Sequence, residues 1–141
     1  MKRYRGSLPS LQIDYYAQTD LAVVSPDEGL ATIEGLMSTE NIRHVVVVDS
    51  EQKLLGLISQ RELRLFLQHA WAEKFCASDV MIQEPYCVEQ GTPLLEVLSA
   101  MKKNKYGAVV VLNEDRQAWG IFTTIDALHL LQTVLVNEVH L

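Results

Sequence analysis

Two hydroxyls and a carboxylate follow directly on an apolar segment late in the chain: Thr123, Thr124 and Asp126 close the stretch GIFTTID, residues 120–126. A threonine hydroxyl donates and accepts hydrogen bonds, whereas an ionised aspartate only accepts them. These side chains can cap the helix that follows, because its first N–H groups lack partners and favour negative charge. They can equally form a small polar cradle for a ligand.

The elements that position these residues occur twice in the chain. Gly56 falls on Gly120 at an offset of 120 − 56 = 64 residues, and no gap is needed over most of the two copies. Apolar runs and turn signals coincide, and GLISQRE in the first copy matches GIFTTID in the second. We therefore expect two copies of one supersecondary unit.

Each copy is expected to have the order strand, helix, strand, strand, helix. The first strands are LAVV and YCV, and the later ones are HVVVVD with LLGLIS and AVVVLN with AWGIF. The later strands are continuous apolar runs, so both faces of each sheet should be covered. Closing helices are predicted near residues 60–75 and 125–136. The first helices show apolar spacing near 3.6 residues, at Leu30, Ile33, Leu36 and Met37 and at Leu94, Val97, Leu98 and Met101.

A single unit of this size would leave much of its sheet exposed. We therefore predict an α+β fold of two β-α-β-β-α repeats packed sheet to sheet as a pseudo-twofold pair. The expected organisation is an N-terminal arm over residues 1–19, a first repeat over 20–76, a second over 77–137, and a tail over 138–141.

Composition excludes several classes of protein. The 141 residues are 48% hydrophobic and 21% charged, the balance of an ordinary globular chain. A formal charge of −6 argues against general nucleic-acid binding. No apolar stretch approaches the roughly 20 residues of a membrane span, so we expect a cytoplasmic protein with no membrane partner. Cys76 and Cys87 lack zinc-ribbon spacing, and no metal site is predicted.

No catalytic constellation stands out either. The sequence shows no serine or cysteine nucleophile with a matched histidine, no phosphate-cradling glycine loop and no carboxylates placed for acid–base work. We expect the chain not to be an enzyme.

The stretches IRHVVVVDSEQKLLGLISQREL and YGAVVVLNEDRQAWGIFTTIDAL resemble a tandem pair of CBS domains, regulatory modules named after cystathionine β-synthase. The linking segment ASDVMIQEPYCVEQGTPLLEVLSAM is similar to the start of a domain in that family. The resemblance covers Asp20 to Leu135 and leaves roughly the first fifteen residues without a counterpart. It implies clefts that bind AMP, ADP, ATP or an S-adenosyl compound, and no other cofactor.

The resemblance places one ligand site in the cleft of the second repeat. The family motif is a glycine, two apolar residues, Thr or Ser, two variable residues and Asp, and GIFTTID matches it fully. Thr123 and Asp126 then take the hydroxyl and ribose-binding roles, since a carboxylate can accept from both ribose hydroxyls. The adenine ring would lie beside Tyr86, Val88, Gly107 and Ala108.

The first repeat departs from the motif, because Glu62 replaces the aspartate and its extra methylene displaces the carboxylate. Arg43 and His44 match positions where the family often carries phosphate-contacting cations, although both can also be a solvated strand start. One cleft would thus have the ribose end and the other the phosphate end. The residues expected in the first cleft are Val24, Arg43, His44, Ser59 and Glu62.

Two functions remain in view. The first is a module that binds an adenosine-containing ligand and signals its occupancy to an unidentified protein partner. The alternative is a ligand-free dimerisation module that acts by protein–protein interaction. The stretches LRLFL and ALHLLQTVLV carry more leucine and valine than one small sheet pair needs, so we expect a homodimer.

Overall fold

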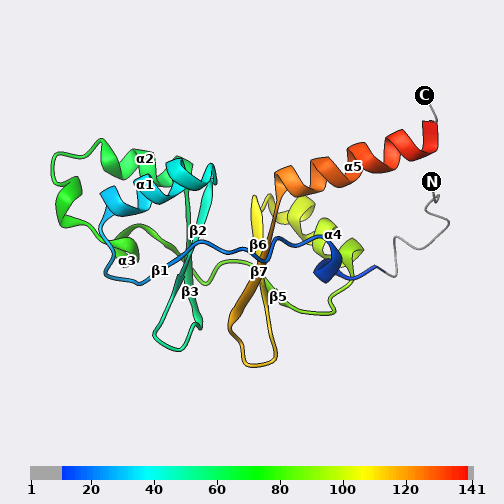
Figure 1. Cartoon of the computed structure of the whole chain (residues 1–141), viewed down its shortest axis with the longest axis horizontal. Helices are drawn as coiled ribbons and strands as arrows, with labels where there is room; N and C mark the ends of the chain where they lie inside the picture. The colour runs from blue at the N-terminus through cyan, green and yellow to red at the C-terminus, as the bar shows by residue number, and fades with distance from the viewer. Residues whose placement is uncertain (1–10, 140–141) are drawn as a thin grey trace. The chain divides into compact units, whose positions relative to one another are not determined.

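The computed structural model describes the backbone of residues 11–139 and the side chains of residues 11–137. It divides into two compact units (Figure 1). The first unit contains residues 20–85 and 116–118, and the second contains the described residues up to 19 together with 86–115 and 119–139. Residues 1–10 of the expected arm and 140–141 of the expected tail lie outside the described residues.

The first unit is built on a four-stranded sheet in the order β1-β2-β3-β4. Strand β1 runs parallel to β2, and β3 runs antiparallel to both β2 and β4. The strands are β1 (Val23–Val24), β2 (His44–Val48), β3 (Leu54–Ser59) and β4 (Ile82–Gln83). The helices are α1 (Leu30–Glu40), α2 (Gln60–Leu67), the 3-10 helix η3 (Ala72–Lys74) and α3 (Ala77–Val80).

The second unit is built on a three-stranded sheet in the order β5-β6-β7, with β5 parallel to β6. The strands are β5 (Cys87–Glu89), β6 (Ala108–Leu112) and β7 (Ala118–Thr123). The helices are the 3-10 helix η2 (Ile13–Tyr15), α4 (Leu94–Asn104) and α5 (Thr124–Val139). The predicted α+β class and the repeated strand–helix order are confirmed, and the packing of one sheet on the other stays a prediction.

Each unit has its own core, in which the middle valines of the sheet meet the apolar face of a helix. In the first unit, Val45 and Val47 pack with Ile33 of α1, and all three are fully buried. In the second, Val109 and Val111 pack with Val97 of α4 in the same way. Burying one such side chain contributes about 1.5–3 kcal/mol, so these contacts hold the helices on the sheets.

The helix predicted over residues 60–75 is shorter, because α2 ends at Leu67. The backbone N–H of Trp71 bonds to Nδ1 of His69 (3.1 Å), a local side-chain bond that competes with continuation of a helix. The chain resumes as η3 instead.

Unusual backbone conformations recur at the offset of 64 residues. Asn41 (φ 53°) and Lys105 (φ 59°) end α1 and α4 in the left-handed region. Gln52 (φ 67°) and Arg116 (φ 62°) occupy the turns between the last two strands of each repeat. Residues other than glycine rarely adopt positive φ, so the two repeats share a turn geometry although the residue types differ.

Each unit is completed by a short segment from the chain that precedes the other repeat. In the second unit, fully buried Ile13 of η2 joins the core, and Gln18 forms an isolated antiparallel bridge with Ile121. In the first unit, the segment at the same offset runs through α3 and β4, where Ile82 pairs with Leu57. We call residues 13–18 and 77–82 the lead-in segments.

Candidate functional site

The residues predicted for the second-repeat cleft gather where β5 and β6 begin, because parallel strands start at the same edge of a sheet. The carbonyl oxygen of Tyr86 accepts from the N–H of Val110 (3.1 Å) at this edge. Helix α5 starts there too, since both the N–H and the Oγ1 of Thr124 donate to the Gly107 carbonyl oxygen (3.0 and 3.2 Å). Ala108, the first residue of β6, is buried, and Val88 lies one strand away in β5.

Thr123 and Asp126 form a reciprocal cap at the start of α5. Asp126 Oδ2 accepts from the N–H and the Oγ1 of Thr123 (2.8 and 3.0 Å). The hydroxyl of Thr123 in turn accepts from the N–H of Asp126 (3.4 Å). A carboxylate in the first turn also complements the helix dipole. The capping interpretation is therefore confirmed, and any ligand contact would be a second role for the same two side chains.

The other carboxylate oxygen of Asp126 has a partner that sequence reasoning missed. Nε2 of Gln18, in the lead-in segment, donates to Asp126 Oδ1 (2.6 Å). The two residues are 108 positions apart. Only the offset gave a signal, because it sets Gln18 against Ile82, which lies in the corresponding lead-in segment.

A second residue that sequence reasoning missed is Tyr106, whose ring stacks on that of Tyr86. Their ring centroids are 4.8 Å apart and their planes are inclined by 19°. Withdrawal from water raises the pKa of Tyr86 above its usual value, and the negative charge of Glu96 adds to this effect, followed by Tyr106 and Cys87. A base inserted between the rings would need roughly twice this separation, so it must approach from outside the stack or displace Tyr106.

The first-repeat residues occupy the equivalent positions with fewer bonds. The N–H of Gln60 donates to the Arg43 carbonyl oxygen (2.8 Å), as Thr124 does to Gly107. His44 pairs with Ser59 across β2 and β3, and Val24 is buried in β1. Ser59 Oγ accepts from the N–H of Glu62 (3.3 Å). No bond from the Ser59 N–H back to the Glu62 carboxylate is formed among the described residues, so this cap is one-sided.

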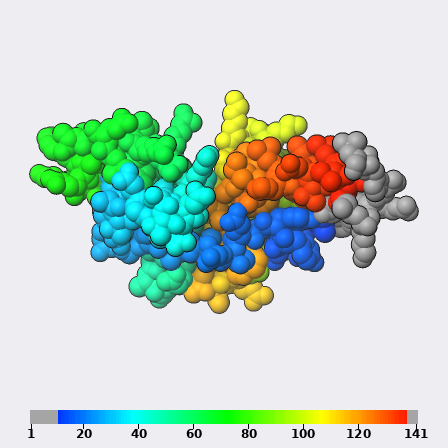
Figure 2. Space-filling view, turned by 45° about the horizontal axis from the view of Figure 1, so that its top comes forward, coloured from blue at the N-terminus to red at the C-terminus, as the bar shows by residue number. Residues whose placement is uncertain are grey.

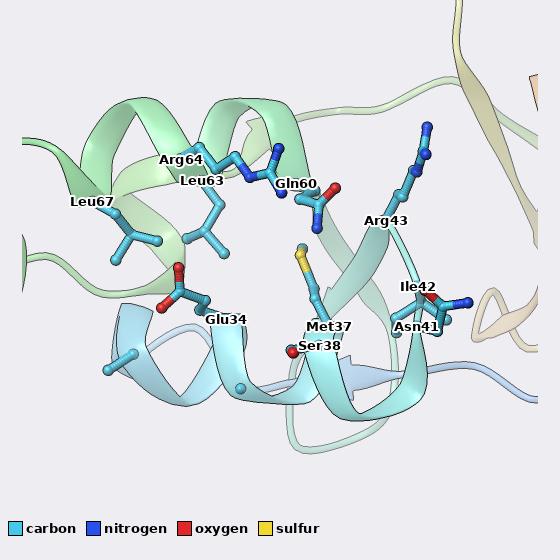
Figure 3. Close-up of a pocket in the computed structure, with 12 residues that line it drawn as sticks. Glu34, Met37, Ser38, Asn41, Ile42, Arg43, Gln60, Leu63, Arg64 and Leu67 are labelled. Carbon is cyan, nitrogen blue, oxygen red and sulfur yellow. The ribbon is translucent and has the colours of Figure 1, made fainter.

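The largest cavity we describe lies in the first unit between α1 and α2, with a volume of about 640 Å³ (Figure 3). Side chains of Met37 and Leu63 reach into it, and Arg43 stands at its rim. Of the residues predicted for the first cleft, Arg43 alone lines it. The remaining lining residues are Ala31, Glu34, Gly35, Ser38, Asn41, Ile42, Gln60, Arg64 and Leu67.

A smaller cavity of about 250 Å³ in the second unit borders Asp126. Tyr15 and Tyr16 line it from the lead-in segment, and His129, Leu130 and Thr133 line it from α5. Asp126 is therefore accessible beside the helix that it caps.

Metal and membrane sites were searched over the same residues. Within residues 11–137, no group of three or more His, Cys, Asp or Glu side chains is placed to hold a metal ion. None of the helices in the described part of the chain has the length and apolar character of a membrane span.

The family model for the CBS domain matches residues 13–69 and 77–133. The two ranges begin 77 − 13 = 64 residues apart, the offset found in the sequence and in the backbone. Each range starts in a lead-in segment. The expectation that about the first fifteen residues lack a family counterpart is therefore wrong from residue 13 onward.

Related proteins contain this sequence as part or most of their length. A CBS domain-containing protein of Dictyostelium discoideum is 29% identical over 110 residues, which are 70% of this chain and 76% of that protein. The inosine-5′-monophosphate dehydrogenase of Methanocaldococcus jannaschii is 28% identical over 109 residues, which are 77% of this chain but 21% of the enzyme. The enzyme relative is thus matched over only a fifth of its length.

Solved structures have the same fold. A Vibrio cholerae protein named AcuB is 27% identical, covers 91% of this chain with 96% of its own, and has a TM-score of 0.79. CBSX2 in complex with AMP is 19% identical, with 87% and 97% covered and a TM-score of 0.76. A CBS domain pair in complex with 5′-methylthioadenosine and S-adenosyl-L-methionine is 20% identical, with 89% and 98% covered and a TM-score of 0.80. With both repeats matched by the family model and the fold shared with these pairs, the chain belongs to the CBS domain family.

Proposed function

We propose that this CBS pair is a regulatory module that binds an adenosine-containing small molecule in the cleft of its second repeat and signals its occupancy to a protein partner. The observation that carries the proposal is the assembly of the GIFTTID residues with Gly107 at one edge of the sheet. The complexes of CBSX2 with AMP and of a CBS pair with S-adenosyl-L-methionine support the ligand class. The module itself has a sensing role and no catalytic one.

The carboxylate of Asp126 would accept from the ribose hydroxyls. Its Oδ2 is already fixed by Thr123, so the carboxylate keeps one orientation before any ligand arrives. A group held in place in advance loses less entropy on binding. The Thr123 hydroxyl can exchange its bond to Asp126 for one to a ribose or phosphate oxygen.

The adenine ring would lie along the start of β5 and β6. Tyr86 and Val88, both half-buried, offer apolar surface there, and Gly107 and Ala108 leave room beside the backbone. Tyr106 would either turn away from Tyr86 or present its outer ring face to the base.

The charge near this cleft favours ligands with few phosphates. Gly107 and Ala108 stand where the first repeat has Arg43 and His44. Lys102 and Lys103 lie in the last turn of α4 and are exposed. The cleft should therefore prefer adenosine, AMP or an S-adenosyl compound to ATP.

One observation favours the alternative, a ligand-free module that acts by dimerisation. Helix α5 (orange to red in Figure 2) carries large apolar side chains that are about half exposed, although a single chain should cover them. They are Ile125 (48% exposed), Leu128 (55%), Leu131 (53%), Leu135 (52%) and Val136 (58%). We propose that a second copy covers this face in a homodimer, a state compatible with either function.

The test is calorimetric titration of the wild type, Asp126→Ala and Glu62→Ala with AMP and with S-adenosylmethionine. Loss of the Asp126 contact should weaken binding by about ten- to hundredfold, as expected for a charged hydrogen bond of roughly 1.5–3 kcal/mol. Glu62→Ala is the matched control in the other repeat and should change affinity much less. A ligand at 100 times its dissociation constant should add about 2.7 kcal/mol to the free energy of unfolding. If neither compound nor ATP moves the melting temperature, the dimerisation module is the better description.

A further inference from the structure

We propose that Gln18 is a further residue of the second-repeat site, which competes with a ribose for Asp126 and thereby sets the affinity of the cleft for a cis-diol. The proposal rests on the ligand role assigned above to Asp126. It adds a residue that lies outside the GIFTTID motif and outside the second repeat. Its basis is the 2.6 Å bond from Gln18 Nε2 to Asp126 Oδ1.

The side chain of Gln18 is directed to Asp126 by its own backbone. The N–H of Gln18 donates to the Ile121 carbonyl oxygen (2.8 Å), and the N–H of Ile121 donates back to the Gln18 carbonyl oxygen (2.9 Å). Gly120 allows this approach, because a Cβ there would lie 3.2 Å from the Gln18 carbonyl oxygen. The amide of Gln18 is therefore held beside α5 by two bonds that do not involve its side chain.

The acceptor positions of Asp126 are nearly filled in this arrangement. An ionised carboxylate offers about four of them, two on each oxygen. Two donors from Thr123 occupy Oδ2, and Gln18 occupies one position on Oδ1. One position remains, whereas a ribose that binds through both hydroxyls needs two. The second ribose bond therefore requires Gln18 to withdraw.

The first repeat lacks this competitor. The position equivalent to Gln18 is Ile82, whose side chain cannot donate a hydrogen bond, and the position equivalent to Asp126 is Glu62. The lead-in strands are otherwise alike, since Ile82 pairs with Leu57 as Gln18 pairs with Ile121. The difference between the two clefts thus lies in one amide side chain.

The experiment is calorimetric titration of AMP into the wild type, Gln18→Ala and Gln18→Asn. Both substitutions keep the backbone bridge, and the shorter Asn amide cannot reach Asp126 as Gln18 does. Removing an exposed competitor for one hydrogen bond should tighten AMP binding by roughly three- to tenfold. Gln12→Ala removes another exposed glutamine of the same segment, one whose side chain has no recorded bond to Asp126, and should leave the affinity unchanged.

A second ligand separates competition from a general effect on the cleft. The 2′,3′-dideoxy analogue of AMP has no hydroxyl for Asp126, so its affinity should be equal in the wild type and in Gln18→Ala. Weaker or unchanged AMP binding by Gln18→Ala, with Asp126→Ala still impaired, overturns the role of Gln18 and leaves the proposed function standing. Equal tightening for both ligands also overturns it. Absence of AMP binding by every variant overturns the proposed function and this inference together.

Discussion

Gly120 packs directly against Gln18: a Cβ added to the glycine would lie 3.2 Å from the carbonyl oxygen of Gln18, a backbone atom of the lead-in segment. The equivalent Gly56 is closer still to its own lead-in segment, since a Cβ there would lie 2.9 Å from the Ile82 carbonyl oxygen and 2.7 Å from Cγ of Met81. The glycine of each repeat is therefore required for the segment that completes the unit, before any ligand is considered.

We expect Gly56→Ala to lower the free energy of unfolding by about 1–3 kcal/mol, the usual cost of overpacking. Gly120→Ala should cost less, because neighbours at 3.2 and 3.3 Å need to give by only a few tenths of an ångström. Urea denaturation measures both. Gly35→Ala is the control: a Cβ there meets nothing within 4 Å, and removing a glycine from α1 should stabilise the protein by roughly 0.5–1 kcal/mol. A larger loss from Gly120→Ala than from Gly56→Ala would contradict the ranking.

Asp79 should make stability depend on pH in the acid range. Hydrogen bonds from the backbone N–H of Cys76 (2.8 Å) and then from its Sγ (3.3 Å) lower the pKa of Asp79 below its usual value, while partial loss of water opposes them. Because the folded pKa lies below the unfolded one, this contribution is present above the unfolded pKa, near about 3.9, and is lost as pH falls through the folded pKa.

The expected result is that Asp79→Asn is less stable than the wild type near neutral pH, and that the gap closes below about pH 4. Urea denaturation at several pH values gives this difference directly. Glu73→Gln serves as the control for removing one nearby exposed charge. A gap that stays constant from neutral to strongly acidic pH would show that the Cys76 bonds do not stabilise the carboxylate.

The exposed face of α5 should hold two copies together. We expect the wild type to have the mass of a dimer by light scattering at micromolar concentration, since C2 association is the commonest way to cover such a face. Leu128→Glu with Leu135→Glu places charges in that surface and should yield monomers. Thr133→Glu, on the same helix but with its hydroxyl bonded to the His129 carbonyl oxygen, is the control. A monomeric wild type would refute the dimer.

Ligand charge should decide affinity in the second-repeat cleft. AMP is expected to bind more tightly than ATP, because Asp126 is negative and no basic side chain stands at Gly107 or Ala108. The AMP preference should shrink as salt is raised, since salt screens repulsion between exposed charges. Arg43→Ala should leave AMP binding there unchanged. Tighter ATP binding at low and high salt alike would assign the ligand to the other cleft.

The sequence alone determined the repeat, because the offset of 64 residues is a property of spacing. Continuous valine runs predicted the buried strands, and the helical spacing of Ile33 and Val97 predicted the faces that enter the cores. The motif GIFTTID predicted a capped helix at a strand end, since Thr123 and Asp126 are local neighbours. Such features depend on contacts within a few residues, which a pattern can carry.

Tertiary structure alone decided which segments complete each unit and what Asp126 touches. Gln18 and Asp126 are far apart in sequence, and their bond exists because Ile121 pairs with the lead-in strand. Stacking of Tyr106 on Tyr86 likewise depends on how α4 returns the chain to the sheet. The early end of α2 follows from a bond between His69 and Trp71 that helical periodicity does not register. Contacts of this kind are set by packing between distant segments, so residue spacing could not predict them.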